Sequence, residues 1–233
     1  KSISIEQQIV FKNTSSDILN EIYLNDWANS FSGKNTPLGK RFSENYSSDF
    51  HFEKKKYRGN TQIESVSTES SSPLLWDRSE AIDVLKIILD QPLQPLESYT
   101  LNLKYTIKLP DTKFTRYGVN KQNDYNLQYW YLSPVVYDGK WQVYSNKNTE
   151  DLYSNPSTFI IKLHTPERYK LISDFNMVSE SLSQGIKTTT LKGENRIKAI
   201  VYLEQLPSFE TIATDQLEVI TNIAKKKVTP PIR

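Results

Sequence analysis

The sequence has no cysteine and only two histidines, His51 and His164, among its 233 residues. Without cysteine the chain forms no disulfide and offers no thiolate nucleophile and no Cys-based zinc or iron–sulfur site. The two histidines lie far apart in the sequence, so they cannot form the pair at i and i+4 that binds zinc on a metallopeptidase helix. We therefore expect no catalytic residue, no metal ligand and no cofactor in this chain, and no enzymatic activity from it alone.

Glycine, long apolar runs and excess charge are scarce as well. The seven glycines form no strained Gly-flanked turn of the kind that exposes a hydrolase nucleophile. No run of about 18 apolar residues is present, so we expect no membrane span. The 29 basic and 27 acidic residues give a net charge of +2, and no nucleic-acid partner is expected at that balance.

Alternation of apolar and polar residues is the main pattern that is present. Residues 99–109 put six apolar side chains on one face of a long strand, and residues 3–11 repeat the pattern. Residues 82–89 are apolar at both odd- and even-numbered positions and fit either a buried strand or a short helix. The prolines that follow, Pro92 and Pro95, favour a hairpin-like pair with the next strand. Further strand patterns occupy residues 159–163, 188–191, 197–203 and 217–223.

One helix start is well marked. Thr36 can act as the N-cap and Pro37 fits the first helical position, which predicts one or two turns up to about Tyr46. The Ser- and Asn-rich residues 65–72 and 146–155 are expected to be loops. The sequence therefore predicts an all-β fold with one or two short helices, built from a mostly antiparallel, twisted sheet that is saddle-shaped or sandwich-like.

Aromatic residues are concentrated in residues 114–153, which we call the aromatic segment and which hold 10 of the 27 aromatics. Because Tyr and Trp have high β-propensity, they can simply fill a core there. Alternatively, they form a binding rim, and the Asp138–Gly139 turn signal predicts that Trp130 and Trp141 are neighbours. The candidate rim residues are Asp124, Gln128, Trp130, Tyr131, Asp138 and Trp141.

Several phrases carry a resemblance to a known family. In order along the chain they are residues 20–30 (NEIYLNDWANS), 99–110 (YTLNLKYTIKLP), 116–118 (RYG), 130–131 (WY), 137–142 (YDGKWQ) and 219–223 (VITNI). Their succession is similar to the amino-terminal β-domain of bacterial zinc aminopeptidases of the aminopeptidase N family. In that family the β-domain is followed by a catalytic domain, which carries a Gly-x-Met-Glu-Asn segment and a His-Glu-x-x-His zinc helix. Neither motif is present here.

The resemblance implies a non-catalytic domain, residues 1–223, that forms one wall of a peptide cleft, followed by a linker, residues 224–233, toward an absent catalytic domain. Zinc would belong to that domain, and the partners would be that domain and peptide substrates. In the family a Gln or Glu ahead of an aromatic–Pro pair contacts the substrate α-amine. Here Leu132 follows Trp130–Tyr131 in place of Pro, so Asp124 and Gln128 are only candidates for this contact. The lack of cysteine is compatible with an exported parent protein and does not fix its compartment.

Two alternatives use the same fold. The first is a free-standing carbohydrate- or protein-binding β-sandwich whose aromatic cluster at residues 125–141 is the binding face. It predicts that Trp130 and Trp141 are exposed side by side. The second is a docking surface for other subunits of an assembly, which would present an exposed apolar patch.

Overall fold

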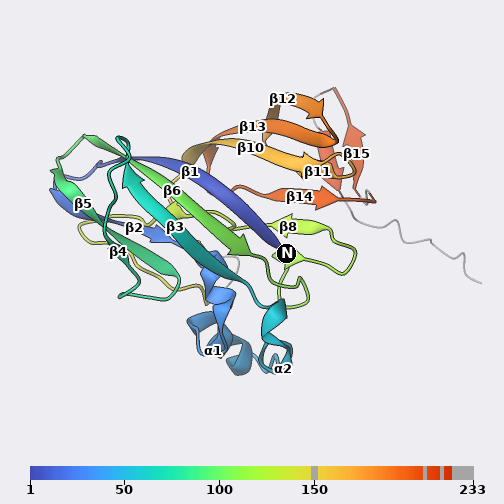
Figure 1. Ribbon diagram of the computed structural model, residues 1–233, viewed down its shortest axis with the longest axis horizontal. Helices are drawn as coiled ribbons and strands as arrows, with labels where there is room; N and C mark the ends of the chain where they lie inside the picture. The colour runs from blue at the N-terminus through green and yellow to red at the C-terminus, as the bar shows by residue number, and fades with distance from the viewer. Residues whose placement is uncertain (148–151, 207–208, 216–217, 222–233) are drawn as a thin grey trace, which may run out of the picture.

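The computed structural model describes residues 1–147, 152–206, 209–215 and 218–221. Within these residues the chain is all-β with a few short helices, as the sequence predicts, and every pair of named strands is antiparallel. Figure 1 shows two groups of strands, with the long strands at one side, two further sheets at the other and the helices below. The proposed linker, residues 224–233, lies outside the described residues.

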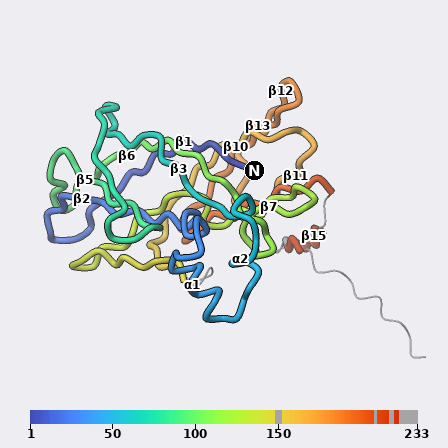
Figure 2. Tube along the Cα trace, turned by 60° about the horizontal axis from the view of Figure 1, so that its bottom comes forward, coloured from blue at the N-terminus to red at the C-terminus, as the bar shows by residue number. Residues whose placement is uncertain are grey.

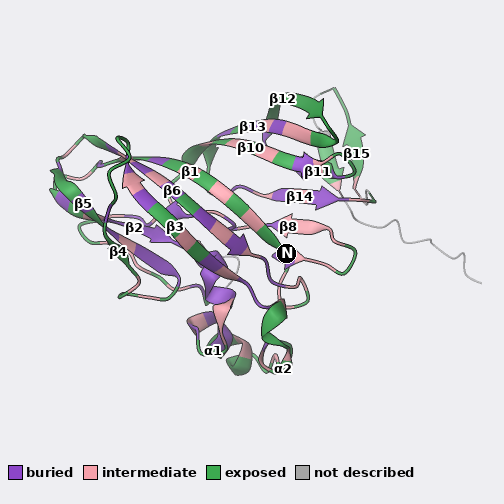
Figure 3. Ribbon diagram, in the orientation of Figure 1, coloured by how far each residue is buried: buried purple, intermediate pink, exposed green. Residues whose placement is uncertain are grey.

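The long strands form a three-stranded sheet in the order β1–β6–β3. Its members are β1 (Ser2–Lys12), β6 (Ser98–Lys108) and β3 (Asn60–Thr68). The predicted alternation on β6 is confirmed, because Tyr99, Leu101 and every second residue after them are buried. Figure 3 shows the resulting bands of buried and exposed residues along the strands of this sheet.

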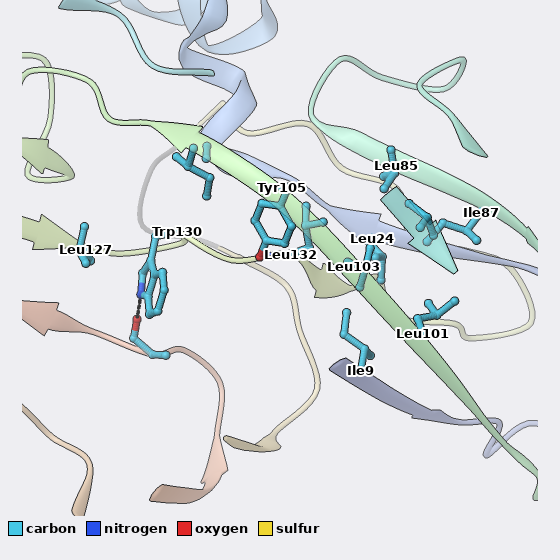
Figure 4. Close-up of a cluster of buried hydrophobic side chains, with 14 of the residues drawn as sticks. Ile9, Leu24, Leu85, Ile87, Leu101, Leu103, Tyr105, Leu127, Trp130 and Leu132 are labelled. Atoms are coloured by element: carbon cyan, nitrogen blue, oxygen red, sulfur yellow. Dashed lines mark hydrogen bonds between the residues drawn. The ribbon is translucent and has the colours of Figure 1, made fainter. Parts of the chain in front are cut away.

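A second sheet, in the order β4–β5–β2–β9, packs on the first. It contains β4 (Trp76–Asp77), β5 (Val84–Leu93), β2 (Leu19–Asn25) and β9 (Ser133–Pro134). Leu24, Leu85 and Ile87 of this sheet lie in one hydrophobic cluster with Leu101 and Leu103 of the first. Figure 4 shows these side chains between the strands. Residues 84–89 of the apolar run at 82–89 thus belong to strand β5 and not to a helix, and Ile82 and Asp83 form the turn before it.

The predicted hairpin between β5 and β6 is wrong, because the two strands belong to different sheets. β5 pairs with β2 and β6 pairs with β1, so the connection crosses from one layer of the sandwich to the other. At the crossing the backbone of Asn13 exchanges two hydrogen bonds with Leu96 and Glu97, at 2.8 and 2.9 Å. The prolines therefore mark a turn between layers. The connection from β1 to β2 crosses between the same two layers.

Two smaller sheets complete the fold. One has the order β10–β13–β12, with β10 (Ser157–Pro166), β13 (Ile186–Arg196) and β12 (Asn176–Ser183). The other has the order β11–β14–β8–β7, with β11 (Lys170–Ser173), β14 (Val201–Glu204), β8 (Tyr125–Leu127) and β7 (Gly118–Val119). Leu127, Leu191 and Val201 join the same hydrophobic cluster as the long strands. A separate hairpin pairs β15 (Glu210–Ala213) with β16 (Glu218–Thr221).

Part of one predicted loop is a strand. Residues 65–68 belong to β3, where Val66 and Thr68 are buried. β3 is an edge strand whose outer face meets water, so serine is tolerated there. Of the other predicted loop, residues 146–155, the structure describes 146–147 and 152–155, which are irregular.

The helices lie together on one side of the strands, as Figure 2 shows. They are α1 (Pro37–Glu44), α2 (Asp49–Phe52) and two 3-10 turns, η1 (Trp27–Ser32) and η2 (Lys55–Tyr57). The predicted cap is confirmed: the Thr36 hydroxyl oxygen accepts a hydrogen bond from the Gly39 amide at 3.0 Å. The same hydroxyl group donates to the Ser30 carbonyl at 2.7 Å and so ties α1 to η1.

Replacing Thr36 with alanine removes both interactions. We expect the free energy of unfolding to fall by about 1–2 kcal/mol, since N-cap loss alone costs about 1 kcal/mol. Urea denaturation measures the change. Thr36→Ser keeps the hydroxyl group and should retain most of the stability, and equal losses in both variants would contradict a capping role.

Candidate functional site

The aromatic segment joins the two halves of the fold. Its strands β7 and β8 lie in the sheet with β14, whereas β9 pairs with β2 in the sandwich. Between β8 and β9 the backbone is anchored by β1 and β6: the Gln7 amide donates to Leu132 O at 2.7 Å, and Leu132 N donates to the Tyr105 hydroxyl at 3.2 Å. Tyr105 also donates a short hydrogen bond to Gln7 Oε1. Burial raises the pKa of Tyr105, so its hydroxyl stays protonated.

Trp130 and Tyr131 bind one backbone position from both sides. The Trp130 indole donates its Nε1–H to the Ala199 carbonyl at 3.1 Å, and the Ala199 amide donates to the Tyr131 hydroxyl at 3.1 Å. Trp130 is only 6% exposed, and the dashed line in Figure 4 marks the hydrogen bond of its indole nitrogen. Tyr131 packs its ring edge on Phe159 at 5.3 Å, and burial raises its pKa. Both residues therefore hold the aromatic segment in place against residues that follow it in the sequence.

Trp141 and Asp138 belong to a separate turn. Tyr137 and Trp141 form an antiparallel bridge around Asp138–Gly139, and Gly139 has a φ of +64°, so the predicted turn is confirmed. Trp141 is half-buried against Phe11, at 5.8 Å between ring centroids, and Tyr23, at 5.3 Å. Asp138 is exposed at the tip.

The expectation that Trp130 and Trp141 are exposed side by side is wrong. Trp130 is buried on Ala199, and Trp141 packs on β1 and β2. Trp130 belongs to the hydrophobic core and Trp141 packs against it, since a large aromatic side chain gains most from burial. A stacking platform of two tryptophans is therefore not formed.

Asp124 and Gln128, the two candidates for an α-amine contact, differ in their surroundings. Asp124 accepts from the Asn120 amide at 3.0 Å with one carboxylate oxygen and from Gln205 N at 3.0 Å with the other. Gln128 is half-buried, and no described residue hydrogen bonds to its side chain. Asp124 thus holds a loop, whereas the Gln128 amide keeps its donors and acceptor free.

A buried polar cluster, which the sequence did not single out, lies beside the aromatic segment. Asp26 is 1% exposed and accepts from the Thr61 hydroxyl at 2.6 Å with Oδ1. Its Oδ2 forms an ion pair with Arg78 at 2.6 Å. The Asp26 backbone amide donates to the Asp83 carbonyl at 2.8 Å, and Asp83 is fully buried. An acidic residue in the apolar residues 82–89 was the only signal in the sequence that pointed to Asp83.

The two histidines have unrelated neighbours. His51 Nε2 lies 2.7 Å from the Ser43 hydroxyl and 2.8 Å from the Gly39 carbonyl, on the helical side of the fold. His164 Nδ1 lies 3.0 Å from the Thr188 hydroxyl, between β10 and β13. Among the described residues no group of three or more His, Asp or Glu side chains is arranged to hold a metal ion. The described side chains therefore do not fit a zinc site.

One surface groove lies apart from the predicted rim. An open groove of about 390 Å³ is lined by Thr68, Ser70, Asp90, Tyr99 and other polar residues. Its Tyr99 hydroxyl already donates to Asp90 at 2.6 Å.

In the part of the chain that the structure describes, no helix has the length and apolar character needed to span a membrane.

Comparisons with known proteins give the following picture. No protein-family model and no curated protein matches the chain. Among solved structures it is similar to the M1 zinc metallopeptidase from Deinococcus radiodurans, at 12% identity and a TM-score of 0.48, over 92% of this chain and 41% of that one. A mutant of that enzyme bound to a Tyr-Ser-Ala substrate gives 12% identity and 0.48, over 93% and 42%. A two-domain M1 zinc metallopeptidase mutant bound to L-tryptophan gives 13% and 0.47, over 92% and 42%.

The chain thus spans about two fifths of the length of these structures. At such identities and TM-scores the likeness carries no inference about activity.

Proposed function

We propose that this chain is a non-catalytic amino-terminal domain of a zinc-dependent aminopeptidase, which packs on a catalytic domain and forms one wall of its peptide cleft. Zinc and the water that it activates belong, in this proposal, to a catalytic domain outside the given sequence. The role of the present residues is to build a rigid framework that positions that wall.

The observation that carries the proposal is that the phrases resembling aminopeptidase N meet in the fold. Tyr23 of the first phrase packs on Trp141 of the fifth. Gly118 of the third has a φ of +130°, and a Cβ there would lie 2.1 Å from Pro110 O at the end of the second. Burial, and secondarily the charge of Asp26, raise the pKa values of Tyr105 and Tyr117. Residues dispersed over more than a hundred positions thus form one framework.

Exposed apolar side chains support a second domain as partner. The hairpin β15–β16 exposes Ile212, Val219 and Ile220, and a two-stranded hairpin is marginally stable alone. Edge strand β12 exposes Met177 and Leu182. Packing against another domain would cover these side chains and stabilise the hairpin.

Hydrolysis of aminoacyl-anilides by the purified chain tests the proposal. We expect no hydrolysis and no stoichiometric zinc by elemental analysis. A protein extended through the coding sequence downstream of Arg233 should bind one zinc and lose its activity to a chelator. Chelator-sensitive cleavage by the 233-residue chain, or an extended protein without a zinc site, would overturn the proposal.

The extended protein also tests the proposed wall. Gln128→Ala is expected to raise KM for substrates with a free α-amine, because its side-chain amide has no hydrogen-bond partner among the described residues and can accept from that amine. Asp124→Ala is the matched comparison, and its effect should appear in stability, since both carboxylate oxygens are already bonded. Equal KM values for both variants would remove Gln128 from the cleft.

The alternative of a carbohydrate- or protein-binding module loses its main support. It required two adjacent exposed tryptophans, and Trp130 is buried. A glycan that quenches tryptophan fluorescence through Trp141 would restore it.

A further inference from the structure

The helices and turns of residues 34–57, which we call the helical lobe, carry an excess of positive charge. The lobe contains six basic and three acidic residues, whereas the rest of the chain contains 23 basic and 24 acidic residues. The positive net charge of the molecule therefore comes from the helical lobe. Figure 1 and Figure 2 show that the lobe projects from one side of the strands.

Most of the cations in the lobe have no carboxylate partner. The ion pairs of the lobe are Arg41 with Glu44, at 3.2 Å, and Glu53 with Lys113. These pairs leave one carboxylate of the lobe, that of Asp49. The remaining lysines of the lobe are exposed and form no ion pair with any described residue: Lys34, Lys40, Lys54, Lys55 and Lys56. A surplus of unpaired ammonium groups thus faces water.

The lobe also holds the two most exposed of the large hydrophobic side chains in the described part of the chain. Tyr46 is 96% exposed and Phe52 is 87% exposed. The backbone beside each of them is hydrogen bonded: Ser47 N donates to Phe42 O at 2.8 Å, and Phe52 N donates to Ser48 O at 3.1 Å. The fold therefore holds both rings out in water, where an apolar ring is unfavourable.

Phe50 fixes α2 to the rest of the protein and leaves Phe52 on the solvent side. Phe50 is 1% exposed and packs on Phe42 and Phe114, with 5.0 Å between ring centroids in each pair. The Arg58 guanidinium donates to the Phe50 carbonyl at 2.9 Å. Because Phe50 already fills the core position, the ring of Phe52 remains available for an external partner.

Tyr46 stands in a backbone conformation that favours glycine. It follows Asn45, the C-cap of α1, and has a φ of +56°. Glycine is the usual residue there, because a side chain at positive φ costs free energy. Local strain of this kind is found where the strained residue has a function. The strain at Tyr46 displays a ring that contributes little to the core.

We propose that the helical lobe docks on an anionic lipid surface, with Phe52 and Tyr46 entering the headgroup region and the lysines contacting the lipid phosphates. Aromatic rings are favoured at a membrane–water interface, and lysine stems can lie along apolar surface while their ammonium groups reach the headgroups. A lipid surface accepts projecting rings without the matching pocket that a folded protein partner would have to provide. The inference does not depend on the proposed peptidase role.

Co-sedimentation of the 233-residue chain with lipid vesicles tests the docking. We expect binding to vesicles of equal parts phosphatidylcholine and phosphatidylglycerol that weakens with added salt, and little binding to phosphatidylcholine alone. Replacing the three lysines at residues 54–56 with glutamine should weaken binding by about a hundredfold, since each lysine near such a surface contributes about fivefold. The matched control replaces the exposed lysines Lys121, Lys140 and Lys162 with glutamine and should lose far less, although its net charge is the same.

Single variants test the two rings. Phe52→Ala should weaken vesicle binding by about tenfold and leave the urea midpoint unchanged, because the ring lies outside the core. Tyr46→Gly should also weaken binding but raise the urea midpoint, since glycine relieves the strain at positive φ. Ile160→Ala, at a 73% exposed side chain of β10, is the matched control and should change neither. A purely structural role of Tyr46 would not give these opposite changes.

Because the chain has no cysteine, one introduced thiol can report which part of the molecule meets the lipid. An environment-sensitive dye on Ser48→Cys, in the lobe, should shift its emission to shorter wavelength on the anionic vesicles. The same dye on Ser179→Cys, on the exposed strand β12, should not shift. The proposal would be overturned by an unshifted dye on Ser48→Cys, by equal losses in the two triple-lysine variants, or by wild type that binds a single-stranded oligonucleotide and not the vesicles.

Discussion

Replacing Arg78 with methionine is expected to lower the free energy of unfolding by about 3–5 kcal/mol, because it leaves the Asp26 carboxylate buried without its cation. Asp26 is 1% exposed, and Arg78 Nη2 lies 2.6 Å from its Oδ2. The Arg78 side chain is 16% exposed and also donates to the Ile82 carbonyl at 3.0 Å. Chemical denaturation at neutral pH measures the loss.

The partner variant should cost less. Asp26→Asn removes the buried charge and keeps an acceptor for the Thr61 hydroxyl, and Arg78, the more exposed partner, can regain water. Arg41→Met is the matched control, because its pair with Glu44 is 48% and 64% exposed and should contribute less than about 1 kcal/mol. An Asp26→Asn variant less stable than Arg78→Met would show that the hydrogen bonds of Asp26, and not charge compensation, dominate.

Trp130→Ala is expected to lower the free energy of unfolding by about 3–5 kcal/mol, the usual range for deleting a buried aromatic side chain. The indole is 6% exposed, and its loss leaves a cavity and an unpaired Ala199 carbonyl. The aromatic segment would also lose one of its two hydrogen bonds to Ala199. Denaturant unfolding followed by circular dichroism checks the change without relying on tryptophan fluorescence.

Two controls bracket the effect. Trp130→Phe keeps one aromatic ring but removes the N–H donor and part of the indole volume, so a loss of about 1–3 kcal/mol, smaller than that of Trp130→Ala, is expected. Tyr46→Ala, at a side chain that is 96% exposed, should stay within about 0.5 kcal/mol of wild type. A Trp130→Ala variant as stable as Tyr46→Ala would mean that the indole is not part of the core, and would revive the binding-rim interpretation.

The strand faces, the helix cap and the turn could be predicted from the sequence because each is specified by residues that are close together in the chain. The alternation from Tyr99 onward specifies one buried face of β6, and the Thr36–Pro37 pair specifies the start of α1. The Asp138–Gly139 signal likewise gives the turn that the structure shows. Each of these depends on residues within a few positions of one another.

Strand partners and the buried polar cluster were not readable in this way. Pro92 and Pro95 indicate a turn, but turn residues do not specify whether the chain returns in the same sheet or crosses to the next layer. Asp26 and Arg78 meet across 52 positions, and a side chain's charge carries no information about its partner. The burial of Trp130 was not predictable for the same reason, since a tryptophan in a rim and a tryptophan in a core give the same composition.

The sequence by itself determined the all-β class, the faces of the long strands, the cap of α1 and the lack of a histidine pair for zinc, because each depends on composition or on a short period. The tertiary structure alone decided that Trp130 is buried on Ala199, that β5 and β6 lie in opposite layers, and that Asp26 is buried and paired with Arg78. These features depend on which distant surfaces exclude water together, and that is settled only when the whole core closes.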